Sequence, residues 1–236
     1  MGIRVSGRFI LASASPRRCE LLGLLGLVFD VMPGNIDETF RPGESPRDHV
    51  LRLAEEKALF VARTHPDAWV LGADTIVLVA GEILGKPQSP AEATRMLEKL
   101  SDREHEVLTG FAIVRQDRAV RIREVVGSSV LFRAIDDAEM AWYTATAEPY
   151  DKAGAYAVQG MGGCFIREIR GSFTNVVGLP LCEVFDALKR IKAIGFEQQG
   201  GLPDFRENRT VPFNPEKQGQ YPVLPGKIEP SHLILE

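Results

Sequence analysis

The first half of the chain contains the run Trp69-Val70-Leu71-Gly72-Ala73-Asp74-Thr75-Ile76-Val77-Leu78-Val79. Its nearly continuous apolar character is typical of a strand that is buried on both faces of a sheet. Asp74 interrupts the run, and a buried carboxylate is costly unless it is hydrogen-bonded, bound to a cation or placed at a cleft. Gly72 would allow a bulge or the close approach of a ligand. We predict a central strand that carries a functional acid; the alternative is a structural Asp that caps a turn.

Ser-Pro pairs mark helix starts on both sides of this strand, because Ser is a preferred N-cap and Pro a preferred first helical residue. Three such pairs predict helices, at Ser15-Pro16, Ser45-Pro46 and Ser89-Pro90. The first helix is expected to run to about Gly26. Ser89 and Glu92 have capping-box spacing, and a fourth helix is predicted from Asp136, with Glu139 in the matching place.

Short apolar runs predict the remaining strands. They lie at residues 9–13, 27–32, 107–114, 125–132, 154–158 and 164–169. Residues 107–132 have the pattern of a hairpin. Helices and strands therefore alternate, which predicts an α/β protein with a mixed sheet flanked by helices.

The end of the chain differs from the rest. Residues 197–236 contain six of the fifteen prolines and show no sustained hydrophobic period. We predict one domain over residues 1–196, followed by a Pro-rich C-terminal extension with little regular structure.

Composition argues against several classes of protein. The chain has no apolar run long enough for a membrane span, and its first residues do not resemble a secretory signal, so a cytoplasmic location is expected. Three widely spaced cysteines argue against a disulfide framework and a structural zinc site. A net charge of −4 argues against binding to a nucleic-acid polymer. Neither a P-loop nor a GxGxxG motif is present, and the histidines stand in no recognisable catalytic partnership.

The segment Ser13-Ala14-Ser15-Pro16-Arg17-Arg18 predicts an anion site. A strand runs directly into a helix N-terminus, whose free N–H groups and positive dipole end attract phosphate. Arg17 and Arg18 stand where the dipole disfavours cations, and a bound phosphate would relieve that conflict. The alternative is a capped helix with solvated arginines.

Further candidate residues add cations, carboxylates and amides. Lys57 projects beside the apolar stripe of the second helix, although a long Lys can snorkel out of such a position. Glu38 and Lys86 lie on predicted loops, where each would ordinarily be a solvated charge. The Gly-rich segment 148–164 contains Lys152 and Gln159, and Gln159 offers the donor and acceptor that recognition of a base requires; ordinary loop geometry is the alternative.

Seven short motifs, in order, resemble the Maf family of nucleotide pyrophosphatases between about Ile10 and Leu188. They are Leu11-Ala12-Ser13-Ala14-Ser15-Pro16-Arg17-Arg18, Ile36-Asp37-Glu38-Thr39, Ala54-Glu55-Glu56-Lys57-Ala58, Gly72-Ala73-Asp74-Thr75, Gly85-Lys86-Pro87, His105-Glu106-Val107-Leu108-Thr109-Gly110 and Asn175-Val176-Val177-Gly178-Leu179-Pro180. The resemblance implies two α/β lobes around a deep cleft, and a homodimer.

The resemblance also implies a substrate. Ala73-Asp74-Thr75 is similar to the branch of the family that acts on dTTP and UTP, whereas the 7-methyl-GTP branch tends to carry Ser-Asp-Gln there. It implies that Asp74 activates water and that Arg18, Thr75 and Gln159 set specificity. Ser13, Arg17 and Lys152 are further expected contacts to substrate.

The expected reaction is attack of water on the α-phosphorus, with release of pyrophosphate. Glu38 and Asp74 would hold Mg²⁺ or Mn²⁺, and Lys57 and Lys86, with both arginines, would neutralise the leaving group. Two alternatives stay open at this point. One is a nucleotide-binding regulator of cell division without turnover, and the other is a nucleotidyltransferase, which would need an acceptor site.

Overall fold

The computed structural model describes residues 2–197 of the chain. The predicted extension, residues 197–236, lies outside the described residues except for Glu197, which ends strand β9. No helix among residues 2–197 combines the length and the apolar character that a membrane crossing requires.

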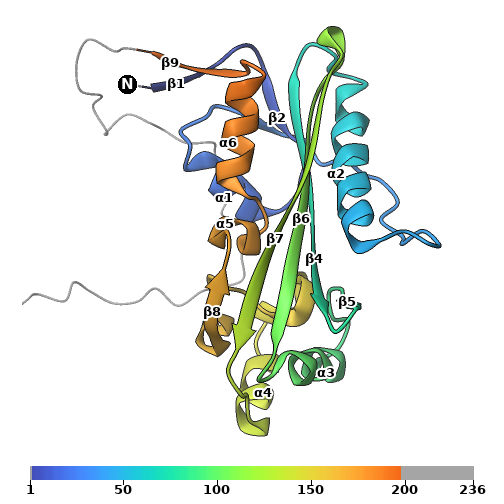
Figure 1. The fold of residues 1–236 in the computed structure, drawn as a ribbon, viewed down its shortest axis with the longest axis vertical. Helices are drawn as coiled ribbons and strands as arrows, with labels where there is room; N and C mark the ends of the chain where they lie inside the picture. Colours follow the sequence, from blue (N-terminus) through green and yellow to red (C-terminus); the bar gives the residue numbers. More distant parts are fainter. Residues whose placement is uncertain (1, 198–236) are drawn as a thin grey trace, which may run out of the picture. The chain divides into compact units, whose positions relative to one another are not determined.

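The centre of the fold is a seven-stranded mixed sheet (Figure 1). Its strands are β2 (Phe9–Leu11), β3 (Asp30–Val31), β4 (Trp69–Val79), β5 (Glu82–Leu84), β6 (Glu104–Arg115), β7 (Val120–Phe132) and β8 (Ile166–Arg170). The order is β3-β2-β4-β6-β7-β8, with β5 paired to β4. Strand β2 is parallel to β3 and β4, and the other pairs are antiparallel. The predicted hairpin is the β6–β7 pair, and β1 (Gly2–Val5) pairs separately with β9 (Ile194–Glu197).

Helices cover both faces of this sheet (Figure 1). They are α1 (Pro16–Gly23), α2 (Pro46–Ala62), α3 (Pro90–Leu100), α4 (Asp137–Thr144), α5 (Phe173–Val177) and α6 (Leu181–Arg190). Helix α2 packs on one face, where Ala54 and Ala58 meet Val70 and Ala112. The opposite face carries two separate cores. The mixed α/β fold predicted from the sequence is therefore confirmed.

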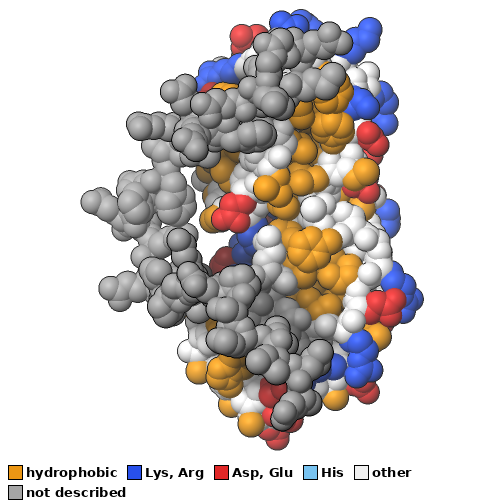
Figure 2. All heavy atoms as spheres, turned by 90° about the vertical axis from the view of Figure 1, so that its left-hand side faces the viewer, with side chains coloured by type: hydrophobic (Ala, Val, Ile, Leu, Met, Phe, Trp, Pro, Cys, Tyr) orange, Lys and Arg blue, Asp and Glu red, His pale blue; other side chains and the backbone are white. Residues whose placement is uncertain are grey.

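The two cores give the opposite face two lobes. One joins α1, α5 and α6 to β2 and to the first part of β4, and contains Trp69, Phe111 and Leu188. The other joins α3, α4 and the 3-10 turns of residues 148–165 to the far parts of β4, β6 and β7. In the space-filling view of Figure 2, hydrophobic side chains form two main areas, with charged side chains of both signs at a recess between them.

Two glycines let α2 lie directly against the sheet. A Cβ at Gly72 would lie 2.1 Å from the Ala54 carbonyl oxygen, and one at Gly110 would lie 2.5 Å from that of Val50. Gly72 therefore serves the packing of a helix, not the approach of a ligand or a bulge as its position in the strand had suggested. Any side chain at either position would push α2 away from the sheet.

Several local predictions were wrong. Residues 154–158 form no strand, because Gly154 adopts a φ of 72° inside a turn and packs against Val77. Helix α1 ends at Gly23, and β3 is confined to residues 30–31. The capping box at Asp136 is present, but at Ser89 only half of it forms, because the Glu92 carboxylate accepts from the amide of Gln88 instead.

Candidate active site

The candidate site lies where one edge of β4 has no neighbouring strand. On that edge β2 pairs with residues 69–71 and β5 with residues 77–79, whereas β6 occupies the other edge from 70 to 78. Residues 72–76 are therefore left without a strand partner on this edge within the described part of the chain. Side chains alternate between the faces of a strand, so a cavity at such an edge is reached from both faces. Asp74 and Thr75 consequently line the same cavity from opposite sides.

This cavity has a volume of about 790 Å³, within the range of small-molecule sites. All ten residues predicted to form the site line it: Ser13, Arg17, Arg18, Glu38, Lys57, Asp74, Thr75, Lys86, Lys152 and Gln159. The structure thus brings together residues that are spread over most of the domain, although their individual roles stay predictions.

Lys57 joins two carboxylates on the α2 face. Its Nζ lies 2.7 Å from Asp74 Oδ1 and 2.7 Å from Glu38 Oε1. The side chain of Lys57 is only 9% exposed, so it does not snorkel into solvent. Partial burial raises the pKa of Glu38, but the hydrogen bond and charge of Lys57, with the charges of Lys86 and Arg18, outweigh it and leave that pKa below its ordinary value. The pair of carboxylates therefore converges on one cationic point.

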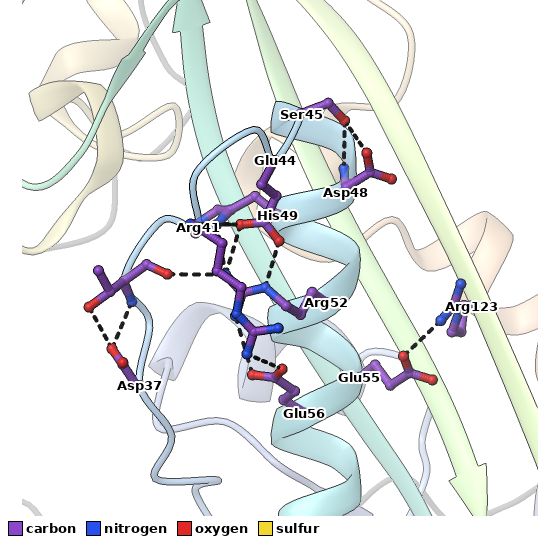
Figure 3. Close-up of polar contacts among 11 residues, drawn as sticks. Asp37, Arg41, Glu44, Ser45, Asp48, His49, Arg52, Glu55, Glu56 and Arg123 are labelled. Atoms are coloured by element: carbon purple, nitrogen blue, oxygen red, sulfur yellow. Dashed lines mark hydrogen bonds and ion pairs between the residues drawn. The ribbon is translucent and has the colours of Figure 1, made fainter.

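The loop that carries Glu38 is fastened to α2 by Arg52 (Figure 3). The guanidinium of Arg52 donates from Nε and Nη2 to the Glu44 carboxylate, at 2.5 and 2.9 Å, and from Nη1 to Glu56 at 3.2 Å. Its Nη2 also lies 3.1 Å from the carbonyl oxygen of Thr39, the residue after Glu38. Helix α2 therefore supplies both Lys57 and the anchor of the loop whose carboxylate Lys57 binds.

Glu44 is the centre of this anchor. Its carboxylate accepts from Arg52 and from the Nδ1–H of His49, whose ring stacks on Phe40. Despite partial burial, the Arg52 hydrogen bond, helped by that of His49, lowers the pKa of Glu44 to about 2. Glu44 thus stays ionised, and the loop stays fastened, throughout the neutral range.

Arg18 dominates the opposite face of β4. It donates from Nε to the Gly178 carbonyl oxygen at 2.8 Å, from Nη1 to Ser13 Oγ at 3.2 Å and from Nη2 to Thr75 Oγ1 at 3.0 Å. Burial lowers the pKa of Arg18, with the charge of Asp74 acting in the opposite direction. These three contacts fix the plane of the guanidinium at the wall of the cavity.

The remaining predicted site residues differ in how many contacts their side chains make. Arg17 forms an ion pair of 3.0 Å with Asp151, and Lys152 contacts the same carboxylate and the Glu148 carbonyl oxygen. The side chains of Lys86 and Gln159 are exposed and form no hydrogen bond or ion pair with another described residue. Both are therefore free to meet a ligand.

The start of α1 departs from the prediction in one respect. The Ser15 side chain forms no capping bond, and Ser13 Oγ instead accepts from the Ser15 amide at 3.2 Å. The first turn contains no acidic residue, but the ion pair with Asp151 partly compensates the positive charge of Arg17. Asp151 had not been selected from the sequence, because nothing in its neighbourhood indicates a partner so distant along the chain.

Among the described carboxylates that line the cavity, Glu38 and Asp74 share one cation, whereas Asp151 is paired with Arg17 and Lys152. Among residues 2–197 no three His, Cys, Asp or Glu side chains cluster as a metal site would require. Two carboxylates nevertheless fit Mg²⁺ or Mn²⁺, because such ions are commonly held by one or two carboxylates together with waters and substrate phosphates. The convergence of both carboxylates on the Lys57 ammonium shows that one cation can meet both.

Fold and cavity together define an α/β protein with a cation-rich cleft suited to a polyanionic ligand next to a buried acid. The chain belongs to the Maf family, since the family model described as "Maf-like protein" matches residues 8–191.

Two relatives carry names that state an activity. The "dTTP/UTP pyrophosphatase" of Syntrophus aciditrophicus (strain SB) is 57% identical over 189 residues, covering 80% of this chain and 92% of the relative. The protein of the same name from Geotalea uraniireducens (strain Rf4) is 51% identical over 192 residues, covering 81% and 99%. A nucleoside-triphosphatase / dITP/XTP pyrophosphatase of Mycobacterium abscessus has a TM-score of 0.38 at 15% identity over 78% of this chain and 95% of that one, a likeness too low to support a conclusion.

Proposed function

We propose that this chain hydrolyses dTTP and UTP to the monophosphate and pyrophosphate. The names of the two relatives support this substrate class. The observation that carries the proposal is the bridge from Asp74 through Lys57 to Glu38, placed in a cavity with four further cations. These cations are Arg17, Arg18, Lys86 and Lys152.

Asp74 is the proposed general base. Lys57 occupies its Oδ1, whereas Oδ2 forms no hydrogen bond with another described residue. Oδ2 can therefore accept a proton from a water molecule that attacks the α-phosphorus. The short, charged contact to Lys57 fixes the carboxylate in place, which is what a base in a water-filled cleft requires.

The leaving pyrophosphate is the proposed ligand of the free cations. The ammonium group of Lys86 forms no hydrogen bond or ion pair within the described residues, and Arg17 and Lys152, which both contact Asp151, line the same cavity. Charge develops on the bridging oxygen as the anhydride bond breaks, and cations held in advance stabilise that charge most. Glu38 and Asp74 would hold a divalent cation, which supplies further charge neutralisation and a water of lowered pKa.

Release of pyrophosphate tests the proposal. We expect turnover of dTTP and UTP, with Mg²⁺ or Mn²⁺, well above that of CTP, ATP, GTP and 7-methyl-GTP. A preference for 7-methyl-GTP would support the proposed reaction but contradict the assignment of dTTP and UTP as substrates. Tight nucleotide binding without release of pyrophosphate from any of the six would instead favour a regulator. Sedimentation of the purified protein tests the expected homodimer, and the cytoplasmic location stays a prediction.

A further inference from the structure

A chain of hydrogen bonds runs from the wall of the cavity into the core. Thr109 faces Thr75 in the β4–β6 register, and their hydroxyl oxygens lie 2.9 Å apart. Thr109 is fully buried, and its hydroxyl lies 3.1 Å from the main-chain carbonyl oxygen of Asn175. Asn175 is itself buried, and its side-chain amide donates to the Val107 carbonyl oxygen and to Ser128 Oγ, each at 3.0 Å. The inner end of the chain is therefore fixed.

The direction of this chain follows from the number of protons. A hydroxyl has one proton, and a carbonyl oxygen can only accept, so Thr109 gives its proton to Asn175. Thr109 must then accept from Thr75, whose alternative acceptor, the Gly178 carbonyl oxygen, is more distant at 3.4 Å. Thr75 in turn accepts from Arg18 Nη2 at 3.0 Å. Both hydroxyl protons therefore point inward, away from the cavity.

The cavity consequently meets Thr75 as an acceptor only. Its proton and one lone pair are engaged, and a second lone pair is left for a ligand, since Thr75 is partly exposed and lines the cavity. Arg18 beside it retains unused N–H donors, because its five N–H groups make three contacts. An acceptor flanked by donors complements an imide, in which an N–H lies between two carbonyl groups.

We propose that Thr109 is a positioning residue for base selection: by taking the proton of Thr75, it makes the cavity favour the imide N–H of uracil and thymine over cytosine. Cytosine carries an unprotonated ring nitrogen at that position, so two acceptors would face each other. This inference rests on the proposed function for its ligand class, but it concerns binding and does not depend on turnover.

The test is binding of non-hydrolysable α,β-methylene UTP and CTP, measured by calorimetry on the full chain. We expect the wild type to bind the UTP analogue more tightly by about 10- to 100-fold, the effect of one unpaired buried polar group. Thr109→Val frees the Thr75 proton to turn toward the cavity. The affinity for the UTP analogue divided by that for the CTP analogue, the UTP/CTP ratio, should therefore fall to about one-tenth or less of its wild-type value. Thr109→Ser keeps the proton path and should restore the ratio.

Controls separate positioning from general damage. Thr144→Val removes another buried hydroxyl, bound to the Met140 carbonyl oxygen in α4, and should leave the ratio unchanged. If Thr109→Val does not fold, Thr75→Ala, which removes the acceptor itself, should show the same fall. An unchanged ratio in a folded Thr109→Val protein, or no preference in the wild type, would overturn the inference. Selective binding without pyrophosphate release would overturn only the proposed function.

Discussion

Asp74 and Thr75 are neighbours on β4, yet their side chains lie on opposite faces of the strand and are held by different kinds of contact. On the α2 face, full charges meet: Asp74 and Glu38 share Lys57, and Glu38 lies on a loop held by further ion pairs. On the other face, Thr75 accepts from the Arg18 guanidinium, and neutral hydrogen bonds continue from it through Thr109 to a main-chain carbonyl group. Contacts between two full charges weaken when a change of pH neutralises one partner or when salt screens them, whereas the hydrogen bonds among Thr75, Thr109 and Asn175 involve no titrating group. A substitution on one face should therefore impair hydrolysis without changing nucleobase selection, and a substitution on the other face should do the reverse.

The largest effect is expected from Asp74→Asn. It keeps the shape of the side chain but removes the proposed base, so kcat should fall by a factor on the order of 10³. Binding preference between uracil and cytosine should persist, because Thr75 and Thr109 are untouched. Circular dichroism checks the fold, and Asp137→Asn, an exposed acid in the first turn of α4, is the control. Near-normal turnover of this variant would show that Asp74 is not the general base.

A large change in stability is expected from His105, on the Thr75 face. Its Nδ1 is buried without a partner among the described residues, Nε2 lies 2.8 Å from the Tyr156 hydroxyl, and burial lowers its pKa from 6.5 to about 4. The unfolded chain therefore binds a proton below pH 6.5 that the folded one refuses until about pH 4. Stability should fall by roughly 3 kcal/mol as the pH drops through this window.

Urea unfolding at a series of pH values measures this loss. His105→Gln, which does not titrate in this range, should flatten the curve between pH 6.5 and 4. Its stability at pH 7 can be lower than that of the wild type, so the slope is the quantity to compare. A slope equal to that of the wild type would show that another group titrates.

A smaller effect is expected from Arg52→Gln, which unfastens the loop of Glu38. Turnover should fall by about 10-fold, as is usual when a supporting contact of a site is lost. Arg47→Gln, on the same helix but bonded to the Val125 carbonyl oxygen, is the matched control and should stay close to the wild type. In a Glu38→Gln background, Arg52→Gln should cost little more, because both act through one carboxylate. Additive losses would contradict this coupling.

The smallest effect is expected from Glu44→Gln. Its pKa of about 2 lies below the ordinary value of 4.5, so Glu44 stabilises the fold above pH 4.5 and loses that contribution as the pH falls toward 2. The side chains of Glu44 and Arg52 are only 8% and 13% exposed, so the loss should be visible as a change in the slope of stability against pH. Acid unfolding of the variant should be less steep in this window. Some slope will remain from Glu139, whose pKa Arg133 also holds at about 2.

Patterns that depend on neighbouring residues were read correctly from the sequence. The long apolar run of β4 and the β6–β7 hairpin are as predicted, because such runs are fixed by burial alone. The Ser-Pro pairs do precede helices. The ten predicted site residues share one cavity, an arrangement that the order of the family motifs had implied.

Contacts that depend on strand register could not be read in this way. Nothing in the sequence states that Thr109 faces Thr75, because β4 and β6 are joined through β5 and α3 rather than by a tight turn that would fix their register. Nothing in the sequence indicates that Arg52 binds Glu44, since the fold of the loop over α2 has no local signal. The apolar run at 154–158 was mistaken for a strand because a short run does not show where a glycine will reverse the chain.

The edge of β4 at residues 72–76, which has no strand partner among residues 2–197, also limits how this chain can change. A strand presents successive residues to opposite faces, so one inserted or deleted residue between 72 and 74 would exchange the places of acid and hydroxyl. Such a variant would keep both functional side chains and yet lose both hydrolysis and base selection at once. Length variation should therefore be confined to the loops, while β4, paired with β6 from Val70 to Leu78, keeps its length.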